Sequence, residues 1–289
     1  MAHRVTHLPR TQQPQDGNLR PASAYADLHA AFIGGTDALI GAAPGNRWTR
    51  NGSPTISVER DGIASATDNY ANANYWTGPS VDGGSLTWPG VTVVAVLPRM
   101  VTFAVAGQQS AVLSIAPSGD YYGVAALVVR RNAGSVRPNI GWYAGDSSSQ
   151  LTPGTYGAWQ NVNQWASNDR LVIVARWDKS TTSIAVDRNG TVTRNSNAHA
   201  YGWRTGAHVM CVGSDTWASG GALVSPLALA AVIPRDVGAE AEAELLGNPW
   251  ALFAPRRVLV PVAAGAPPAF VAAWAANANT VIQSGARAA

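Results

Sequence analysis

The sequence contains one cysteine, Cys211, among 289 residues. A single cysteine excludes an intrachain disulfide and any metal site built from several cysteines, so stability must come from packing or from assembly. The residues before it, His208, Val209 and Met210, are typical of a β-strand. We therefore expect Cys211 to be a buried and unreactive thiol.

Charged residues are also scarce, at 13% of the chain, whereas 46% of the residues are hydrophobic. This balance excludes a charge-rich disordered chain and a coiled coil. The 20 basic residues include one lysine, Lys179, and they are scattered along the chain. Because nucleic-acid-binding proteins gather their cations into a patch or stripe, we expect no nucleic-acid partner.

Long apolar runs are missing as well. No segment reaches the roughly 18 consecutive apolar residues of a membrane span, so we expect no membrane insertion. The first twenty residues, MAHRVTHLPRTQQPQDGNLR, also lack the apolar segment of a signal peptide, which argues against Sec export.

Turn-forming and aromatic residues, by contrast, are plentiful, with 29 Gly, 18 Pro, 11 Trp and 8 Tyr. Short apolar runs, broken by Gly, Pro or Asn-Gly, recur about every 8 to 12 residues, which is typical of a β-sandwich. Asp61-Gly62 predicts a hairpin between 55–59 and 63–66, and Asn189-Gly190 predicts one between 183–187 and 191–194. We expect an all-β, two-sheet antiparallel sandwich with at least ten strands.

The region 234–246, rich in Ala and Glu, is the one segment with a helical pattern, and Gly247, Asn248 and Pro249 end it. We expect three parts: an N-terminal arm over 1–22, the sandwich domain over 23–262, and a C-terminal docking tail over 263–289. The arm is polar and proline-rich, so its order must come from a neighbouring surface. In the tail, Phe270 and Trp274 are the expected docking anchors.

Carboxylates are few and badly spaced for glycoside hydrolysis, which in retaining enzymes needs two of them about 5 Å apart. The chain has four Glu: Glu59 stands alone, and Glu240, Glu242 and Glu244 are spaced by two in the helix, which sends them to different sides. Asp178 and Asp187 bracket a turn and are expected to cap backbone amides. We expect no enzymatic activity.

Histidine and metal chemistry are not indicated either. No G-x-S-x-G motif accompanies the five histidines, His3, His7, His29, His199 and His208. His3 and His7 could ligate a metal at their i, i+4 spacing only on a helix, which Pro9 disfavours, so we expect them to be solvated. Asp120, Asp146 and Asp215 lie in Gly/Ser-rich loops without the series of ligands that Ca²⁺ needs. We expect neither a metal nor another cofactor.

Aromatic residues in or beside loops leave three roles open, because exposed rings stack on sugars and anchor protein interfaces, and other rings fill cores. The proposed contacts for a glycan or a subunit are Tyr75, Trp76, Trp142, Tyr143, Trp159 and Trp165.

The segment 223–257, LVSPLALAAVIPRDVGAEAEAELLGNPWALFAPRR, combines a strand, a short helix and an N-P-W-x-L-F-A-P-R element. It resembles the closing segment of LamG-like, concanavalin A-like jelly-roll proteins of tailed bacteriophages and prophages. The paired strands that end at Asn189-Gly190 and the Pro/Gln leader at 8–15 are similar to the same proteins. Trp250 and Phe253, three residues apart, would share one face and could plug the open end of the sandwich.

The resemblance implies a concanavalin A-like (LamG-type) jelly roll with one short C-terminal helix and extended terminal arms. It further implies a non-enzymatic virion protein on the tail, the tail fibre or the capsid exterior. Such a protein would be made in the bacterial host, would form a homo-oligomer or multi-copy assembly, and would bind other virion proteins. The alternative is a carbohydrate-binding module that recognises host surface polysaccharide.

Overall fold

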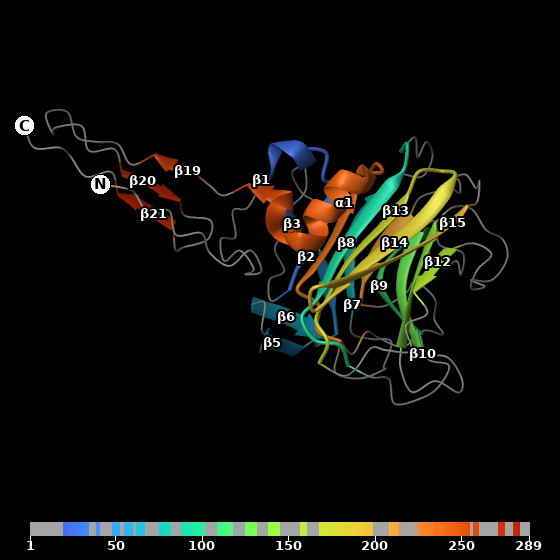
Figure 1. Cartoon of the computed structure of the whole chain (residues 1–289). Helices are drawn as coiled ribbons and strands as arrows, with labels where there is room; N and C mark the ends of the chain where they lie inside the picture. Colours follow the sequence, from blue (N-terminus) through green and yellow to red (C-terminus); the bar gives the residue numbers. More distant parts are fainter. Residues whose placement is uncertain are drawn as a thin grey trace, which may run out of the picture.

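The computed structural model describes residues 20–34, 39–40, 48–52, 55–59, 62–66, 75–81, 88–101, 109–117, 125–131, 138–144, 157–160, 168–198, 208–213, 223, 225–254, 257–259, 271–274 and 280–283. Most of them lie in two packed seven-stranded sheets (Figure 1). The predicted all-β sandwich of more than ten strands, with one short helix, is confirmed.

Both sheets are antiparallel. Sheet I has the order β15 (Thr191–Ala198), β14 (Thr181–Arg188), β13 (Leu171–Trp177), β8 (Val91–Leu97), β17 (Leu229–Ile233), β2 (Ala30–Ile33) and β3 (Leu39–Ile40). Sheet II has the order β12 (Gly157–Gln160), β11 (Pro138–Ala144), β10 (Ala125–Arg131), β9 (Gln109–Pro117), β16 (His208–Val212), β7 (Tyr75–Val81) and β4 (Thr49–Asn51).

The central strands of sheet I are buried on both faces. Along β8, Val91, Val93, Ala95 and Leu97 point into an inter-sheet core that also contains residues of sheet II. The alternate residues Val94 and Val96 belong to a second apolar layer, the outer core, on the opposite face. Because strand side chains alternate between faces, this double burial explains why 91–97 is a nearly continuous apolar run.

The outer core lies between sheet I and the helical segments that cover it. These are η1 (Ser23–Tyr25), α1 (Gly238–Gly247) and η3 (Pro249–Leu252), and Figure 1 shows α1 lying across the sheet. Their buried residues Tyr25, Leu245, Leu246, Trp250 and Leu252 pack on the outward side chains of the sheet. The helix is therefore a cover for the sheet, held by apolar burial.

Trp250 and Phe253 also belong to this cover. They are 5% and 6% exposed, and their ring centroids are 6.4 Å apart. The expectation that the two rings share a face is correct, but the expectation that they plug an open end of the sandwich is wrong. Their position follows from α1, which brings the next turn of chain down onto the outer face of sheet I.

The predicted turns match the structure closely. β5 (Thr55–Glu59) pairs with β6 (Gly62–Ala66), and β14 pairs with β15 through Asn189 and Gly190, whose φ angles are 49° and 93°. Such positive angles at both central residues are what a tight Asn-Gly hairpin turn requires. The helix begins four residues later than predicted, because 234–237 form a turn stabilised by the Thr92 and Asp236 side chains.

The described terminal segments form two further small sheets. β1 (Arg20–Pro21) pairs with β18 (Phe253–Ala254), and Ala22 N donates to Leu252 O at 2.8 Å. Residues 20–22 thus contact the domain, although the sequence assigned them to the arm. β19 (Arg257–Leu259), β20 (Val271–Trp274) and β21 (Thr280–Gln283) pair with one another, across the expected boundary at 262. Phe270 lies outside the described residues.

Candidate functional site

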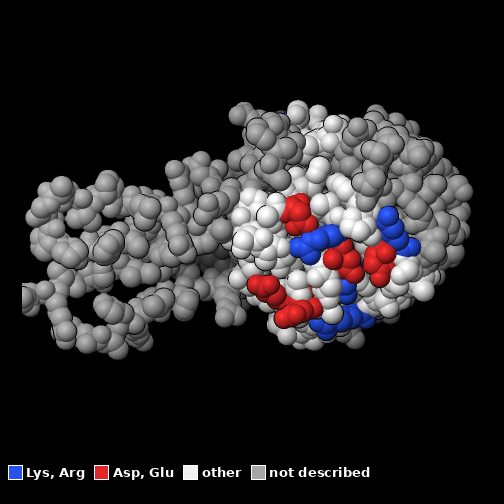
Figure 2. All heavy atoms as spheres, turned by 90° about the horizontal axis from the view of Figure 1, so that it is seen from above, with Lys and Arg blue, Asp and Glu red and all other residues white. Residues whose placement is uncertain are grey.

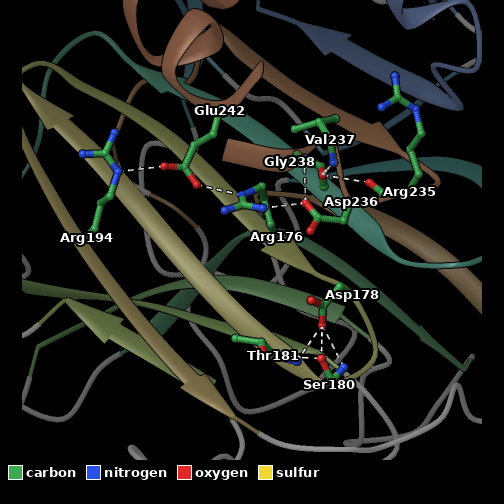
Figure 3. Close-up of polar contacts among 11 residues, drawn as sticks. Arg176, Asp178, Ser180, Thr181, Arg194, Arg235, Asp236, Val237, Gly238 and Glu242 are labelled. Atoms are coloured by element: carbon green, nitrogen blue, oxygen red, sulfur yellow. Dashed lines mark hydrogen bonds and ion pairs between the residues drawn. The ribbon is translucent and has the colours of Figure 1, made fainter. Parts of the chain in front are cut away.

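A cluster of charged side chains lies beside α1 on the outward face of sheet I, where Figure 2 shows acidic and basic groups side by side. Its centre is Glu242, which is 3% exposed. Glu242 Oε2 accepts a hydrogen bond from Arg176 Nε at 2.7 Å, and Oε1 accepts one from Arg194 Nε at 2.8 Å (Figure 3). A buried carboxylate is stable only with such partners.

Arg176 joins this carboxylate to a second one. Its Nη1 lies 2.7 Å from Asp236 Oδ1, which also accepts a hydrogen bond from the amide of Gly238 at 3.0 Å (Figure 3). Burial acts to lower the pKa of Arg176, but hydrogen bonds to Asp236 and Glu242 outweigh it and raise the pKa above its usual value. The guanidinium is therefore a permanent cation that fixes the start of α1 over β13.

The sequence did not indicate that Arg176 bridges Asp236 and Glu242. The available signal was Arg176 itself, the one charge in the apolar strand LVIVARW. Glycoside hydrolysis needs carboxyl groups that reach the substrate. Glu242 is shut off from solvent and both of its oxygens accept guanidinium bonds. We interpret the cluster as a clamp between α1 and strands β13 and β15.

Three other acidic residues singled out from the sequence, Asp178, Asp187 and Glu59, also have structural partners. Asp178 Oδ1 accepts hydrogen bonds from the amides of Ser180 and Thr181 at 2.8 and 2.7 Å, and Asp187 Oδ1 accepts one from the amide of Gly190 at 2.7 Å (Figure 3 shows the Asp178 turn). The predicted capping role of both aspartates is confirmed. Glu59 pairs with Arg99, with Nη2 to Oε1 at 3.1 Å.

Two of the five histidines lie within the described residues. His208 is fully buried on β16, and His29 is half-buried with its ring centroid 5.0 Å from that of Trp88. Burial lowers the pKa of His29. His3, His7 and His199 lie outside the described residues.

Cys211 is 4% exposed on β16, as predicted. Within the described ranges, no three His, Cys, Asp or Glu side chains gather where a metal ion could bind. Asp120, Asp146 and Asp215 fall outside those ranges. Among the described helices, none has the length and apolarity needed to cross a membrane.

The structure separates the first aromatic pair. Trp76 is 3% exposed, and its ring centroid lies 4.7 Å from that of Phe32 in the inter-sheet core. It is a core residue, which corrects its proposal as a glycan or subunit contact. Tyr75, the preceding residue on β7, is half-buried and lies opposite Asn51 of the edge strand β4. Trp165 is not among the described residues.

Strand register divides the second aromatic group between two faces of sheet II. Trp142 is aligned with Leu127, which is buried in the inter-sheet core. Its neighbour Tyr143 therefore has a position on the opposite, outward face. Trp159 is paired with Gly141, and Tyr143 with Gly157, so Tyr143 and Trp159 occupy the same face on adjacent strands. Each of these two aromatic residues is directly opposite a glycine.

The sequence matches no protein-family model and no curated protein. Solved structures do match the fold. The binding domain of botulinum neurotoxin serotype G has a TM-score of 0.51 and 11% identity, with 80% of this chain and 54% of that chain covered. Trypanosoma rangeli sialidase in complex with sialic acid has a TM-score of 0.51 and 10% identity, with 78% and 33% covered.

A third match is the enzymatically active domain of tailspike protein 2 from bacteriophage CBA120, with a TM-score of 0.49 and 16% identity. It covers 70% of this chain and 30% of that chain, so the chain spans less than a third of the tailspike structure. At identities of 10 and 11%, the matches to the neurotoxin domain and to the sialidase establish the β-sandwich fold alone. They include both a binding domain and a sialidase, and a shared fold does not determine activity.

Proposed function

We propose that this protein is a non-enzymatic component of a tailed phage particle, attached through its terminal segments, residues 1–22 and 263–289. The observation that carries the proposal is the pairing of β1 with β18, in which Arg20 lies opposite Ala254. The chain therefore enters and leaves the sandwich at one point. Segments that leave together can bind one partner surface as a unit, which raises their combined affinity.

The burial of sheet I supports attachment through these segments. Its central strands are covered on one face by sheet II and on the other by α1 and η3. This sheet has no apolar face left for a partner in its central strands. The resemblance of 223–257 to phage jelly-roll proteins supplies the assignment to a virion.

The carboxylates support a role without catalysis. Glu59, Glu242 and Glu244 each have a partner within the chain, respectively Arg99, two arginines and Tyr25. Glu240 is exposed on α1, and Glu244, one helical turn further along, is engaged by the Tyr25 hydroxyl. The three partnered glutamates hold the fold together.

Mass spectrometry of purified particles of the phage or prophage that encodes the chain tests this function. We expect the protein in a fixed ratio to the other virion proteins, retained through a density gradient. Protein that is made in the host but absent from washed particles would overturn the proposal. Turnover of a polysaccharide by the purified chain would overturn its non-enzymatic part.

A second function, binding to host surface glycans, is favoured by one observation. Tyr143 and Trp159 occupy register positions on the same face of sheet II, on the adjacent strands β11 and β12. Sugars stack on aromatic rings, and neighbouring rings on adjacent strands suit a chain of sugars. Trp142, on the other face, is excluded from such a site by its register with Leu127.

Affinity electrophoresis in gels that contain the host capsular or cell-wall polysaccharide tests this second function. Tyr143→Ala and Trp159→Ala should each weaken retardation about tenfold or more, whereas Tyr75→Ala should not. Equal retardation of all three variants, or none for the parent protein, would exclude a glycan site at these residues.

A further inference from the structure

The β5–β6 hairpin carries two large apolar side chains that the sandwich does not cover. Ile56 is 54% exposed and Val58 is 86% exposed. They are two residues apart on β5, so they lie on the same face of the hairpin. In the described part of the chain, β5 and β6 pair with each other alone, and Figure 1 shows them projecting from the sandwich. An isolated two-stranded hairpin with an exposed apolar face is marginally stable in water.

The hairpin also lacks the features that normally protect a free strand edge, which are lysine, proline and inward charges. β5 reads TISVE and β6 reads GIASA. Glu59 is the one charge in these strands, and it is held by Arg99 through two hydrogen bonds of 3.1 and 3.3 Å. This ion pair connects the end of the hairpin to the segment after β8. It also compensates the negative charge of Glu59. Among the described strands, β5 pairs with β6 alone, and its single charge is paired with Arg99.

We propose that β5 pairs with β5 of a second copy of this chain, antiparallel and about a two-fold axis through Ser57. In this register, Ile56 of one copy lies opposite Val58 of the other, and Thr55 lies opposite Glu59. Both apolar side chains gain an apolar cross-strand neighbour, and no two like charges face each other. The two hairpins become one four-stranded sheet.

The sequence of β5 favours a second copy over an unrelated strand. A two-fold contact uses the same patch on both partners, so the patch must be complementary to itself. Thr-Ile-Ser-Val-Glu meets this condition. When a second copy runs antiparallel about the central Ser57, Ile56 faces Val58, and both residues are β-branched and apolar. The contact is small compared with the roughly 1,000 Å² of a stable interface, so we expect an affinity in the micromolar range. This inference does not depend on the proposed function.

Disulfide trapping tests the register. Residues opposite each other in antiparallel strands have Cα atoms about 4.5 to 5.5 Å apart, within the range that a disulfide spans. We expect a mixture of full-length Ile56→Cys and Val58→Cys chains to form a covalent dimer under mild oxidation, several times faster than either variant alone. The native Cys211, at 4% exposure, should not react. A mixture that cross-links no faster than its components would overturn the proposal.

Sedimentation of the full chain provides an independent test. Val58→Lys should lower the self-association constant at least tenfold, because it places a charge opposite Ile56. Val192→Lys is the matched control, since Val192 is also an exposed valine, at 38%, but lies on β15. Equal association of both variants would contradict the pairing. If the protein is absent from purified phage particles but the cysteine variants still cross-link, the proposed function is overturned and this inference stands.

Discussion

At the scale of single residues, one group of polar side chains holds α1 and the turn before it in place. Glu242 binds Arg176 and Arg194, and Glu244 accepts a hydrogen bond from the Tyr25 hydroxyl at 3.1 Å. Arg235 binds Asp27 at 2.7 Å. These contacts join α1 and the turn before it to strands and to η1, which are distant in sequence. Substitutions that remove these contacts should lower the free energy of unfolding.

Glu242→Gln should lower the free energy of unfolding by about 3 kcal/mol, because it removes the negative charge that faces two guanidinium groups in a buried site. Urea denaturation at pH 7 measures the difference. Glu240→Gln is the matched control on the exposed side of the same helix and should change stability by about 0.5 kcal/mol or less. Equal effects of the two changes would contradict the clamp.

Tyr25 should make the protein sensitive to alkali. Burial, followed by the charge and hydrogen bond of Glu244, raises the pKa of Tyr25 from 10.0 to about 12. Since the folded pKa is the higher one, this stabilisation is complete below pH 10 and is lost as the pH rises from 10 to about 12. Tyr25→Phe should flatten the decline of the unfolding free energy in that window. A decline as steep as in the parent protein would show that Tyr25 is not responsible.

At the scale of elements, local signals were sufficient where a few neighbouring residues determine the geometry. Asn189-Gly190 and the Asp178 turn behave as the sequence predicts, because side-chain capping and positive φ angles are properties of short segments. The predicted start of α1 was wrong because the hydroxyl of Thr92, distant in sequence on β8, accepts a hydrogen bond from the Val237 amide at 3.2 Å. The buried position of Trp76 likewise depends on Phe32, a partner that no local pattern reveals.

Gly90 lies where two segments of backbone approach each other closely. A Cβ atom at this position would lie 2.3 Å from the carbonyl oxygen of Trp177 and 2.9 Å from the amide nitrogen of Asp236. Gly90→Ala should therefore destabilise the protein by about 2 kcal/mol or more, since backbone atoms of two elements would have to move. Thermal denaturation measures this. Gly247→Ala is the control, because a Cβ atom there meets nothing within 4 Å.

At the scale of the whole molecule, the sequence predicts a sandwich but not which of its faces is covered. The apolar run of β8 indicates burial on two faces. Leu245, Leu246 and Trp250 indicate an apolar face on the closing segment. Only the folded chain brings these together. The candidate contacts illustrate the same limit, since Trp142 and Tyr143 are neighbours in sequence but occupy opposite faces through their register with β10.

In the function proposed above, the terminal segments attach the sandwich domain to the phage particle. The most direct measurement is the number of copies per purified particle for the full chain and for chains that lack residues 1–19 or 263–289. The first deletion preserves Arg20 and Pro21, so the β1–β18 pair remains. We expect both truncated chains to unfold within about 3 °C of the parent, because the two cores are intact, and each to fall at least tenfold in copies per particle. Normal incorporation of either folded, truncated chain would contradict the claim.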